Sequence, residues 1–206
     1  MFNIKQLDLY PTTVYCVDIY DAKENEEYKK FLINLSKTDK GKSYSNKKGY
    51  QSDSILWKEK VFEPLLEKAS HVTQTIIKNI TGHNVYFTAS NEEVQQTVIK
   101  AMWGNVTPKG GYNFIHVHPS AWMSAVYYVQ IPNGDSPLTF QDPRPARMMD
   151  FQRSVLINDE YFEHRCKVGE LVLFPAWLPH YVNPNTSDED RISISFNTHL
   201  RAALSY

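Results

Sequence analysis

Two histidines stand two positions apart in the segment YNFIHVHP, which begins at Tyr112. Alternate side chains of a β-strand point to the same side, so His116 and His118 would share one face of a strand. A third histidine, His180, follows the separate apolar segment GELVLFPAWLP. Imidazole nitrogens are ligands for Fe(II), Mn²⁺ and Zn²⁺, so the three residues predict a metal site. Two histidines and one carboxylate with open coordination positions would be typical of non-haem Fe(II).

The best candidate for such a carboxylate is Asp142, in the segment FQDPR. It stands at the end of the strand that follows the turn PNGDSP. If successive strands run in alternating directions, that end lies at the same open end of the barrel as His118 and His180. An aspartate before a proline is equally suited to cap a turn, so both roles stay open. The other histidines are expected to be structural or to face solvent: His71, His83, His164 and His199.

The segment RISISFN alternates strictly between polar and apolar residues, as a β-strand does. In a small barrel, a polar face turned inward would place Arg191 and Ser193 in a pocket. A guanidinium binds a carboxylate through two parallel hydrogen bonds, and a hydroxyl two residues further on could share that contact. Ten residues separate His180 from Arg191, enough for a strand, a turn and the start of a neighbouring antiparallel strand. The alternative partners for Arg191 are the acidic residues of the adjacent turn, Asp188, Glu189 and Asp190.

The elements that would position these residues are mainly β-strands. Helical spacing of apolar residues predicts helices over Asp21–Ser36 and Ile55–Ile80. The lysine-rich segment Lys37–Asp53 favours a solvated loop over a basic arm for a polyanion. Further on, about eight short strands with turn signals predict a double-sheet barrel or jelly roll. They are Val85–Thr88, Thr97–Val106, Tyr112–His118, Trp122–Ile131, Leu138–Phe140, Val155–Ile157, Glu170–Phe174 and Arg191–Asn197. A further short strand is expected before the helices, over Val14–Ile19. We expect a single domain over residues 1–206, with a helical N-terminal layer (1–84) packed on one face of a β-barrel core (85–206).

Composition narrows the class of protein. The net charge of -1, from 22 Lys and Arg against 23 Asp and Glu, gives no global field that would attract nucleic acid or an anionic membrane. Two cysteines are too few for a disulfide framework and suit a reducing cytosol. No apolar run approaches the length of a bilayer span, so we expect a cytoplasmic globular protein. The aromatic strand Trp122–Val129 could pair across a two-fold axis in a homodimer.

The ordered set of motifs resembles a phage and bacterial group of Fe(II)/2-oxoglutarate-dependent oxygenases related to prolyl 4-hydroxylases. The resemblance extends over most of the chain and includes Trp103-Gly-Asn105, Gly111-Tyr-Asn113-x-x-His116-x-His118-Pro119, Asp142-Pro143-Arg144, Gly169-x-Leu171-x-x-Phe174-Pro175-x-Trp177-x-x-His180 and Asp190-Arg191-Ile-Ser193. It implies a double-stranded β-helix, a cupin-like barrel that binds Fe(II) and uses 2-oxoglutarate and dioxygen as co-substrates. It also implies a dioxygenase, most typically a hydroxylase, that converts 2-oxoglutarate to succinate while oxidising a small-molecule or peptide substrate.

The resemblance also assigns roles to residues. His116 and His180 match the two ligand histidines and Arg191 matches the clamp for 2-oxoglutarate, so these three are the expected catalytic residues. Ser193 would assist Arg191. The cofactor's carboxylates would also receive hydrogen bonds from pocket residues, for which the candidates are Tyr127, Tyr128 and Asn113.

The chain departs from the wider superfamily at one position. Most members have a carboxylate two residues after the first histidine, and here His118 occupies that place. Three metal sites therefore stay open: three histidines, two histidines with Asp142, or two histidines completed by water. Two other functions also remain, because the segment from Gly169 to Asn183 resembles a cupin motif. They are a non-catalytic cupin-like module that binds a metal or ligand, and a three-histidine cupin enzyme that uses no keto acid.

Overall fold

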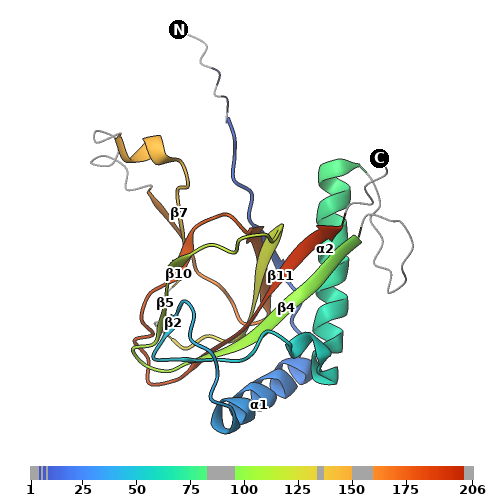
Figure 1. Ribbon diagram of the computed structural model, residues 1–206, viewed down its shortest axis with the longest axis vertical. Coiled ribbons are helices and arrows are strands. Elements are labelled where there is room, and N and C mark those ends of the chain that lie inside the picture. Colours follow the sequence, from blue (N-terminus) through green and yellow to red (C-terminus); the bar gives the residue numbers. More distant parts are fainter. Residues whose placement is uncertain are drawn as a thin grey trace.

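The computed structural model describes residues 9–82, 96–133, 137–149 and 160–201, together with Lys5 and Leu7. Two of the predicted strands, Val85–Thr88 and Val155–Ile157, lie outside these residues, as does His83. The described residues form two antiparallel β-sheets and two α-helices (Figure 1). This arrangement confirms the predicted mainly β, jelly-roll architecture with helices on one face.

The larger sheet has six strands and forms the layer next to the helices. In spatial order these are β1 (Tyr15–Asp18), β9 (Glu170–Pro175), β6 (Met123–Gln130), β11 (Arg191–Arg201), β4 (Gln96–Thr107) and β3 (Tyr50–Gln51). The smaller sheet has five strands. Their order is β2 (Asn46–Lys47), β5 (Tyr112–His116), β10 (His180–Val182), β7 (Leu138–Gln141) and β8 (Tyr161–His164).

The helix α1 (Ala22–Thr38) agrees with the prediction from the sequence. It begins at Asp21, whose Oδ1 accepts hydrogen bonds from the backbone N–H groups of Lys23 and Glu24, both at 3.0 Å. A side-chain oxygen at this position satisfies backbone donors that have no partner within the helix. Asp21 therefore sets the first turn of α1, next to the end of β1.

The helix α2 (Glu63–Thr81) begins later than predicted. Residues from Ile55 onward form two short 3₁₀ turns, η1 (Leu56–Lys58) and η2 (Lys60–Phe62), before the α-helix starts. Pro64 explains the difference, because a proline lacks an N–H group and its ring clashes with a preceding carbonyl anywhere beyond the first helical turn. The predicted stop is confirmed, since Gly82 caps the helix in the left-handed conformation with φ 73°.

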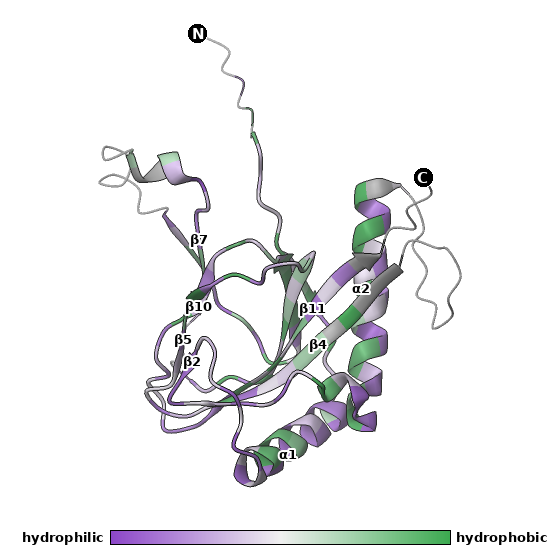
Figure 2. Cartoon of the chain, viewed as in Figure 1, coloured by the Kyte–Doolittle hydropathy of each residue, from purple (hydrophilic) through white to green (hydrophobic). Residues whose placement is uncertain are grey.

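Two hydrophobic cores lie on opposite faces of the larger sheet. On the outer face, the fully buried side chains of Ile192, Ile194 and Phe196 pack in one cluster with residues of α1 and α2. Figure 2 shows that both helices carry apolar residues along one side and polar residues along the other. On the inner face, Val172 and Phe174 belong to a second cluster that fills the space between the two sheets. The larger sheet is therefore buried on both faces, and its inner face is available for a site inside the barrel.

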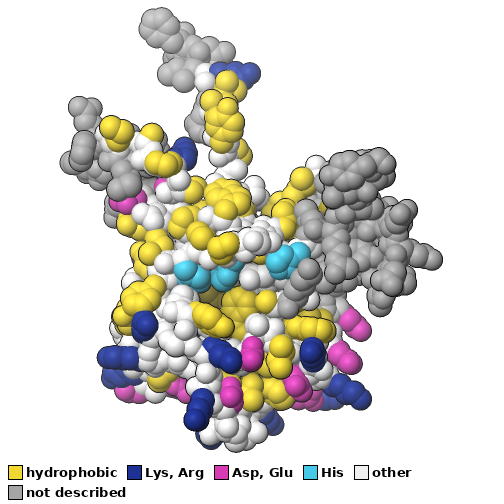
Figure 3. All heavy atoms as spheres, viewed as in Figure 1, with side chains coloured by type: hydrophobic (Ala, Val, Ile, Leu, Met, Phe, Trp, Pro, Cys, Tyr) yellow, Lys and Arg dark blue, Asp and Glu magenta, His cyan; other side chains and the backbone are white. Residues whose placement is uncertain are grey.

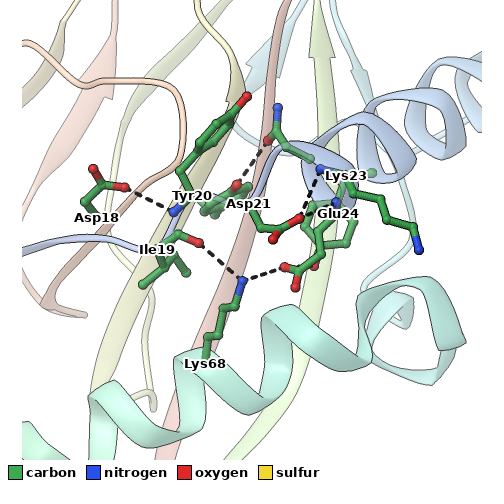
Figure 4. Close-up of polar contacts among 10 residues, drawn as sticks. Asp18, Ile19, Tyr20, Asp21, Lys23, Glu24 and Lys68 are labelled. Atoms are coloured by element: carbon green, nitrogen blue, oxygen red, sulfur yellow. Dashed lines mark hydrogen bonds and ion pairs between the residues drawn. The ribbon is translucent and has the colours of Figure 1, made fainter.

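A polar network ties both helices to the larger sheet (Figure 4). Lys68 of α2 donates hydrogen bonds to Glu24 Oε2 of α1 at 2.7 Å and to the carbonyl of Ile19, just after β1, at 3.4 Å. Tyr28 of α1 donates to the same Glu24 oxygen at 3.1 Å. Because the Lys68 and Glu24 side chains are both partly buried, the ion pair fixes α2 against α1 beside the sheet.

The segment Lys37–Asp53 is more ordered than the predicted solvated loop. It contributes β2 to the smaller sheet and β3 to the larger sheet. The side chain of Asn46 is buried and donates hydrogen bonds to the carbonyls of Lys42 and Gly49 at 3.1 and 3.0 Å. The prediction missed these strands because their pairing partners, β5 and β4, are distant in sequence.

Among the described residues, no helix has the length and apolar character needed to cross a bilayer.

Candidate metal centre

Three histidines meet at the start of β10. His116, the last residue of β5, and His180, the first residue of β10, are direct cross-strand partners. His118 lies two residues beyond β5, where its backbone N–H donates to the carbonyl of Ala176 at 2.8 Å. The ring centroids are 4.3 Å apart for His116 and His180, 5.0 Å for His116 and His118, and 5.1 Å for His118 and His180. One nitrogen from each ring lies within 4.8 Å of the other two.

Backbone carbonyls fix the orientation of two of these rings. His116 Nδ1–H donates to the carbonyl of Phe114 at 2.6 Å, and His180 Nδ1–H donates to that of Leu178 at 2.9 Å. Because a carbonyl can only accept, each Nδ1 carries the proton and each Nε2 keeps a free electron pair. This is the tautomer that binds a metal through Nε2.

Burial keeps the three imidazoles neutral. It lowers the pKa of His180 to about 3 and that of His118 to about 4, and the neighbouring His116 contributes to both shifts. Burial also lowers the pKa of His116. A histidine must be unprotonated to bind a metal ion, so the cluster is in the form that a ligand set requires at neutral pH.

Asp142 does not join this cluster. Its Oδ1 accepts hydrogen bonds from the backbone N–H and the Nε of Arg144 at 3.0 and 2.9 Å, and its Oδ2 pairs with the same guanidinium. The hydrogen bond from the backbone N–H of Arg144 to the Asp142 side chain is the turn-capping contact that the sequence allowed as the alternative role of Asp142. The hypothesis of an Asp142 ligand is therefore not supported, because Arg144 already engages both carboxylate oxygens away from the histidines.

The three histidines line a cavity of about 420 Å³ between the two sheets, a volume that suits a small ligand. Arg191 and Ser193 line the same cavity from β11, with exposed fractions of only 4% and 8%. The polar face of β11 thus turns inward as predicted. Its position differs from the prediction, because β10 and β11 are not neighbours but belong to different sheets and face each other across the barrel. Figure 3 shows histidine side chains beside a hollow in the middle of the face turned to the viewer.

Of the predicted cofactor-binding residues, Tyr128 and Asn113 line the cavity and Tyr127 does not. Tyr127 packs in the outer core, where its hydroxyl donates to Asn25 Oδ1 of α1 at 3.0 Å. Adjacent residues of a strand point to opposite faces, so only one of the two tyrosines can reach the cavity. The prediction of Tyr127 is therefore wrong in this structure.

Further residues line the cavity; Asn105 was expected there from the sequence, whereas Tyr44 and Ser45 were not. Tyr44 and Ser45 come from the segment predicted to be a solvated loop, and Ser45 Oγ lies 3.4 Å from His116 Nε2. Trp103 of β4 lies against His118, with ring centroids 5.7 Å apart. Asn105 Oδ1 is buried and has no hydrogen-bond partner among the described residues, so it offers an acceptor to a ligand in the cavity.

Residues 101–197, which contain most of the described barrel, match the family model described as "Putative 2OG-Fe(II) oxygenase", in which 2OG stands for 2-oxoglutarate. This match covers a little under half of the chain and agrees with the resemblance of the ordered motifs. No curated protein matches the chain significantly.

Solved structures share the fold at low sequence identity. HygX from Streptomyces hygroscopicus, with nickel and 2-oxoglutarate bound, is 12% identical and aligns over 91% of this chain and 82% of its own, with a TM-score of 0.64. A prolyl-4-hydroxylase from Pseudomonas putida is 12% identical over 93% of this chain and 94% of its own, with a TM-score of 0.61. A prolyl hydroxylase from Trichoplax adhaerens, in complex with a peptide fragment, is 13% identical over 90% and 83%, with a TM-score of 0.59. The shared fold confirms the predicted double-stranded β-helix.

Proposed function

We propose that this protein is an Fe(II)/2-oxoglutarate-dependent hydroxylase whose iron ligands are His116, His118 and His180. One observation carries the proposal: three neutral imidazoles and the buried Arg191 line the same cavity from opposite sheets. The imidazoles would supply a metal site, and the guanidinium would supply a site for an organic anion in the same cavity. A simple metal-binding protein would need only the first of these.

The histidine cluster fits a divalent metal ion. Imidazole nitrogen is a suitable ligand for Fe(II), and the hydrogen bonds from Nδ1 to the carbonyls of Phe114 and Leu178 leave two Nε2 atoms unprotonated and able to bind it. Three protein ligands leave coordination positions for 2-oxoglutarate and dioxygen. Iron held by these histidines would supply the activation of dioxygen, coupled to the decarboxylation of 2-oxoglutarate to succinate and to oxidation of the substrate.

The neutral ligand set changes the electrostatics of the site. A carboxylate ligand would reduce the charge of a divalent ion by one, whereas three imidazoles leave the full double positive charge in a buried cavity. 2-Oxoglutarate carries two carboxylates, of which the one at the metal would offset part of that charge while the other pairs with Arg191. We therefore expect metal and 2-oxoglutarate to bind cooperatively, each raising the affinity for the other.

Arg191 would hold the carboxylate of 2-oxoglutarate that is remote from the metal. A buried guanidinium binds a carboxylate strongly and in a defined orientation, and Ser193 lies two residues further along the same face of β11. Asn105 donates hydrogen bonds to Ser193 Oγ and Ser195 Oγ, both at 3.4 Å, which positions these hydroxyls. Asn113 and Tyr128 complete the polar wall of the cavity.

The substrate would be a small molecule or a peptide. Related folds include HygX with hygromycin B bound and a prolyl hydroxylase in complex with a peptide fragment. In this chain the aromatic side chains of Tyr44 and Trp103 line the cavity beside the histidines. Aromatic rings next to a metal site provide apolar contact area for a substrate and exclude water from the reacting atoms.

Aerobic turnover of 2-oxoglutarate tests the proposal. Fe(II)-loaded protein should release succinate in proportion to the 2-oxoglutarate consumed, slowly without substrate and faster with the correct one. Arg191→Ala should lose most of this activity at low 2-oxoglutarate concentration, whereas Asp142→Asn should retain it. Succinate release that is equal in wild type and Arg191→Ala would contradict the proposed clamp.

A second candidate is a three-histidine cupin enzyme that uses no keto acid. The observation that favours it is the ligand set itself, since no carboxylate belongs to the histidine cluster among the residues that the structure describes. This candidate predicts tight metal binding without any effect of 2-oxoglutarate. It also predicts that neutralising Arg191 leaves catalysis intact.

A further inference from the structure

A second group of metal-binding side chains lies outside the cavity. It consists of Cys16, His164 and Glu170, which offer one ligand atom each within 4.8 Å of one another. The Cys16 Sγ and His164 Nε2 atoms are 3.6 Å apart, and His164 Nε2 and Glu170 Oε2 are 2.9 Å apart. The sequence predicted His164 to be structural or to face solvent. In agreement with a structural role, this side chain is only 22% exposed and contacts two other ionisable residues.

The group lies where the edges of the two sheets meet. Cys16 is on β1, the edge strand of the larger sheet, and His164 is on β8, the edge strand of the smaller sheet. Cys16 is paired with Val172, and His164 is paired with Leu138. Val172 and Leu138 both belong to the core between the sheets, so Cys16 and His164 point toward each other across that space. Glu170, on β9, completes the group from the strand next to β1.

The arrangement is not a nucleophile with a base. In a relay of cysteine, histidine and carboxylate, the thiol contacts one ring nitrogen and the carboxylate orients the ring through the other. Here both Cys16 Sγ and Glu170 Oε2 approach the same atom, His164 Nε2. His164 Nε2 carries either one proton or one electron pair, so it cannot form a good hydrogen bond with both Cys16 Sγ and Glu170 Oε2. Three ligand atoms that converge on one point are what a metal ion requires.

We propose that Cys16, His164 and Glu170 bind a zinc ion that joins the edges of the two sheets. A thiolate, an imidazole and a carboxylate are all ligands that Zn²⁺ accepts, and thiolate disfavours Mg²⁺ and Ca²⁺. Tetrahedral zinc holds sulfur and nitrogen ligands roughly 3.5 Å apart, close to the separation of Cys16 Sγ and His164 Nε2. The contact between His164 and Glu170 would open by roughly half an ångström as the ion replaces the shared proton.

The surroundings of the group support this role. The backbone N–H of Lys167 donates to Glu170 Oε2 at 3.2 Å, which orients the carboxylate. Cys16 is exposed, so an ion can reach the site from solvent. Three protein ligands leave one position for water.

Cys166, the other cysteine, is not suited to be the fourth ligand. It packs against the core between the sheets, and burial raises the pKa of its thiol to about 12. Its Sγ lies 3.6 Å from the carbonyl of His164, to which it donates, rather than pointing at the His164 ring. Cys166 therefore provides a matched control for Cys16.

Co(II) is the probe that separates this site from the histidine cluster. Titrated into reduced, metal-free, full-length protein without oxygen, Co(II) bound by a thiolate gives an intense near-ultraviolet charge-transfer absorption that a histidine site lacks. We expect this absorption in the wild type and in His180→Asn, and its loss in Cys16→Ser. Cys166→Ser should keep it, and Glu170→Gln should weaken Co(II) binding at this site by at least about tenfold.

Zinc itself gives the second measurement. Added Zn²⁺ should displace Co(II) from the thiolate site and raise the melting temperature of the wild type more than that of Cys16→Ser. A reduced wild type without the thiolate absorption, or an absorption that survives Cys16→Ser, would overturn the proposal. Failure of Zn²⁺ to displace Co(II) would overturn the assignment to zinc. None of these results depends on 2-oxoglutarate or Arg191, so they test the zinc site independently of the proposed hydroxylase.

Discussion

His116 and His180 are direct partners across β5 and β10, with their ring centroids 4.3 Å apart. Both rings donate through Nδ1 to the carbonyl two residues before them, so the same local geometry is repeated on two antiparallel strands. The pairing of β5 with β10 therefore positions two of the three proposed metal ligands. The third ring, that of His118, reaches the cluster from beyond the end of β5, and its contribution is the one most open to test.

His118 and Asp142 give opposite predictions for metal affinity. His118→Ala should weaken Fe(II) binding at least about tenfold because it removes one of three ligands, whereas Asp142→Asn should leave the affinity within about twofold. Isothermal titration under anaerobic conditions measures both. The result that would reverse the assignment is a strong loss in Asp142→Asn with little change in His118→Ala.

The neighbouring tyrosines of β6 provide a second contrast. Tyr128→Phe should weaken 2-oxoglutarate binding several-fold if its hydroxyl contributes to the polar wall of the cavity. Tyr127→Phe should leave that binding unchanged and should lower the free energy of unfolding by about 1 kcal/mol, since it removes the buried hydrogen bond to Asn25. Binding and urea denaturation are measured on the same preparations. An effect of Tyr127→Phe on 2-oxoglutarate affinity alone would contradict the strand orientation described above.

The contact between α1 and β4 predicts a packing effect. A Cβ atom on Gly104 would overlap Cδ2 of Leu32, which is fully buried. Gly104→Ala should therefore destabilise the protein by about 1–3 kcal/mol through overpacking. In a Leu32→Ala background the added methyl group would enter the space left by leucine, so the same substitution should cost less or become favourable. Urea denaturation of the four proteins in this double-mutant cycle measures the coupling, and strict additivity would contradict it.

The metal-free protein should lose stability as the pH falls. His118 and His180 have pKa values of about 4 and about 3 in the folded protein, below the ordinary value of 6.5 that they regain on unfolding. Between pH 6.5 and pH 4 the unfolded chain therefore binds more protons than the folded chain, and the free energy of unfolding decreases with decreasing pH. His118→Asn should make this dependence shallower. Denaturation of chelator-treated protein across this pH range measures it, and an equal slope in both proteins would contradict neutral burial of His118.

The sequence predicted the elements that depend on local patterns. Alternation in RISISFN identified the inward face of β11, and the His-x-His pair with His180 identified the histidine cluster. Asp142 could not be decided in this way, because an Asp-Pro-Arg segment fits both a ligand and a turn cap. Only the position of Arg144 shows which contact forms.

Contacts between distant strands account for what the sequence did not show. β10 and β11 were expected to be neighbours because few residues separate them, but the connection crosses from one sheet to the other. The group of Cys16, His164 and Glu170 has no local motif, because Cys16 is far in sequence from the other two and reaches them only through the pairing of β1 with β9 and the approach of the two sheet edges. Ser45 reaches the cavity through the pairing of β2 with β5, for which its polar segment gives no signal.

The most direct test of the proposed function is an anaerobic titration of Fe(II)-loaded protein with 2-oxoglutarate, followed by visible absorption. Chelation of Fe(II) by the keto acid should produce a weak metal-to-ligand charge-transfer band in the wild type. In Arg191→Ala the band should require roughly thirtyfold more 2-oxoglutarate or more, since loss of a buried charged hydrogen-bond partner costs about 2–5 kcal/mol. In His118→Ala it should be weak or absent at the same iron concentration. A metal-replete wild type that shows no band at saturating 2-oxoglutarate would contradict the proposed oxygenase and favour the cupin that uses no keto acid.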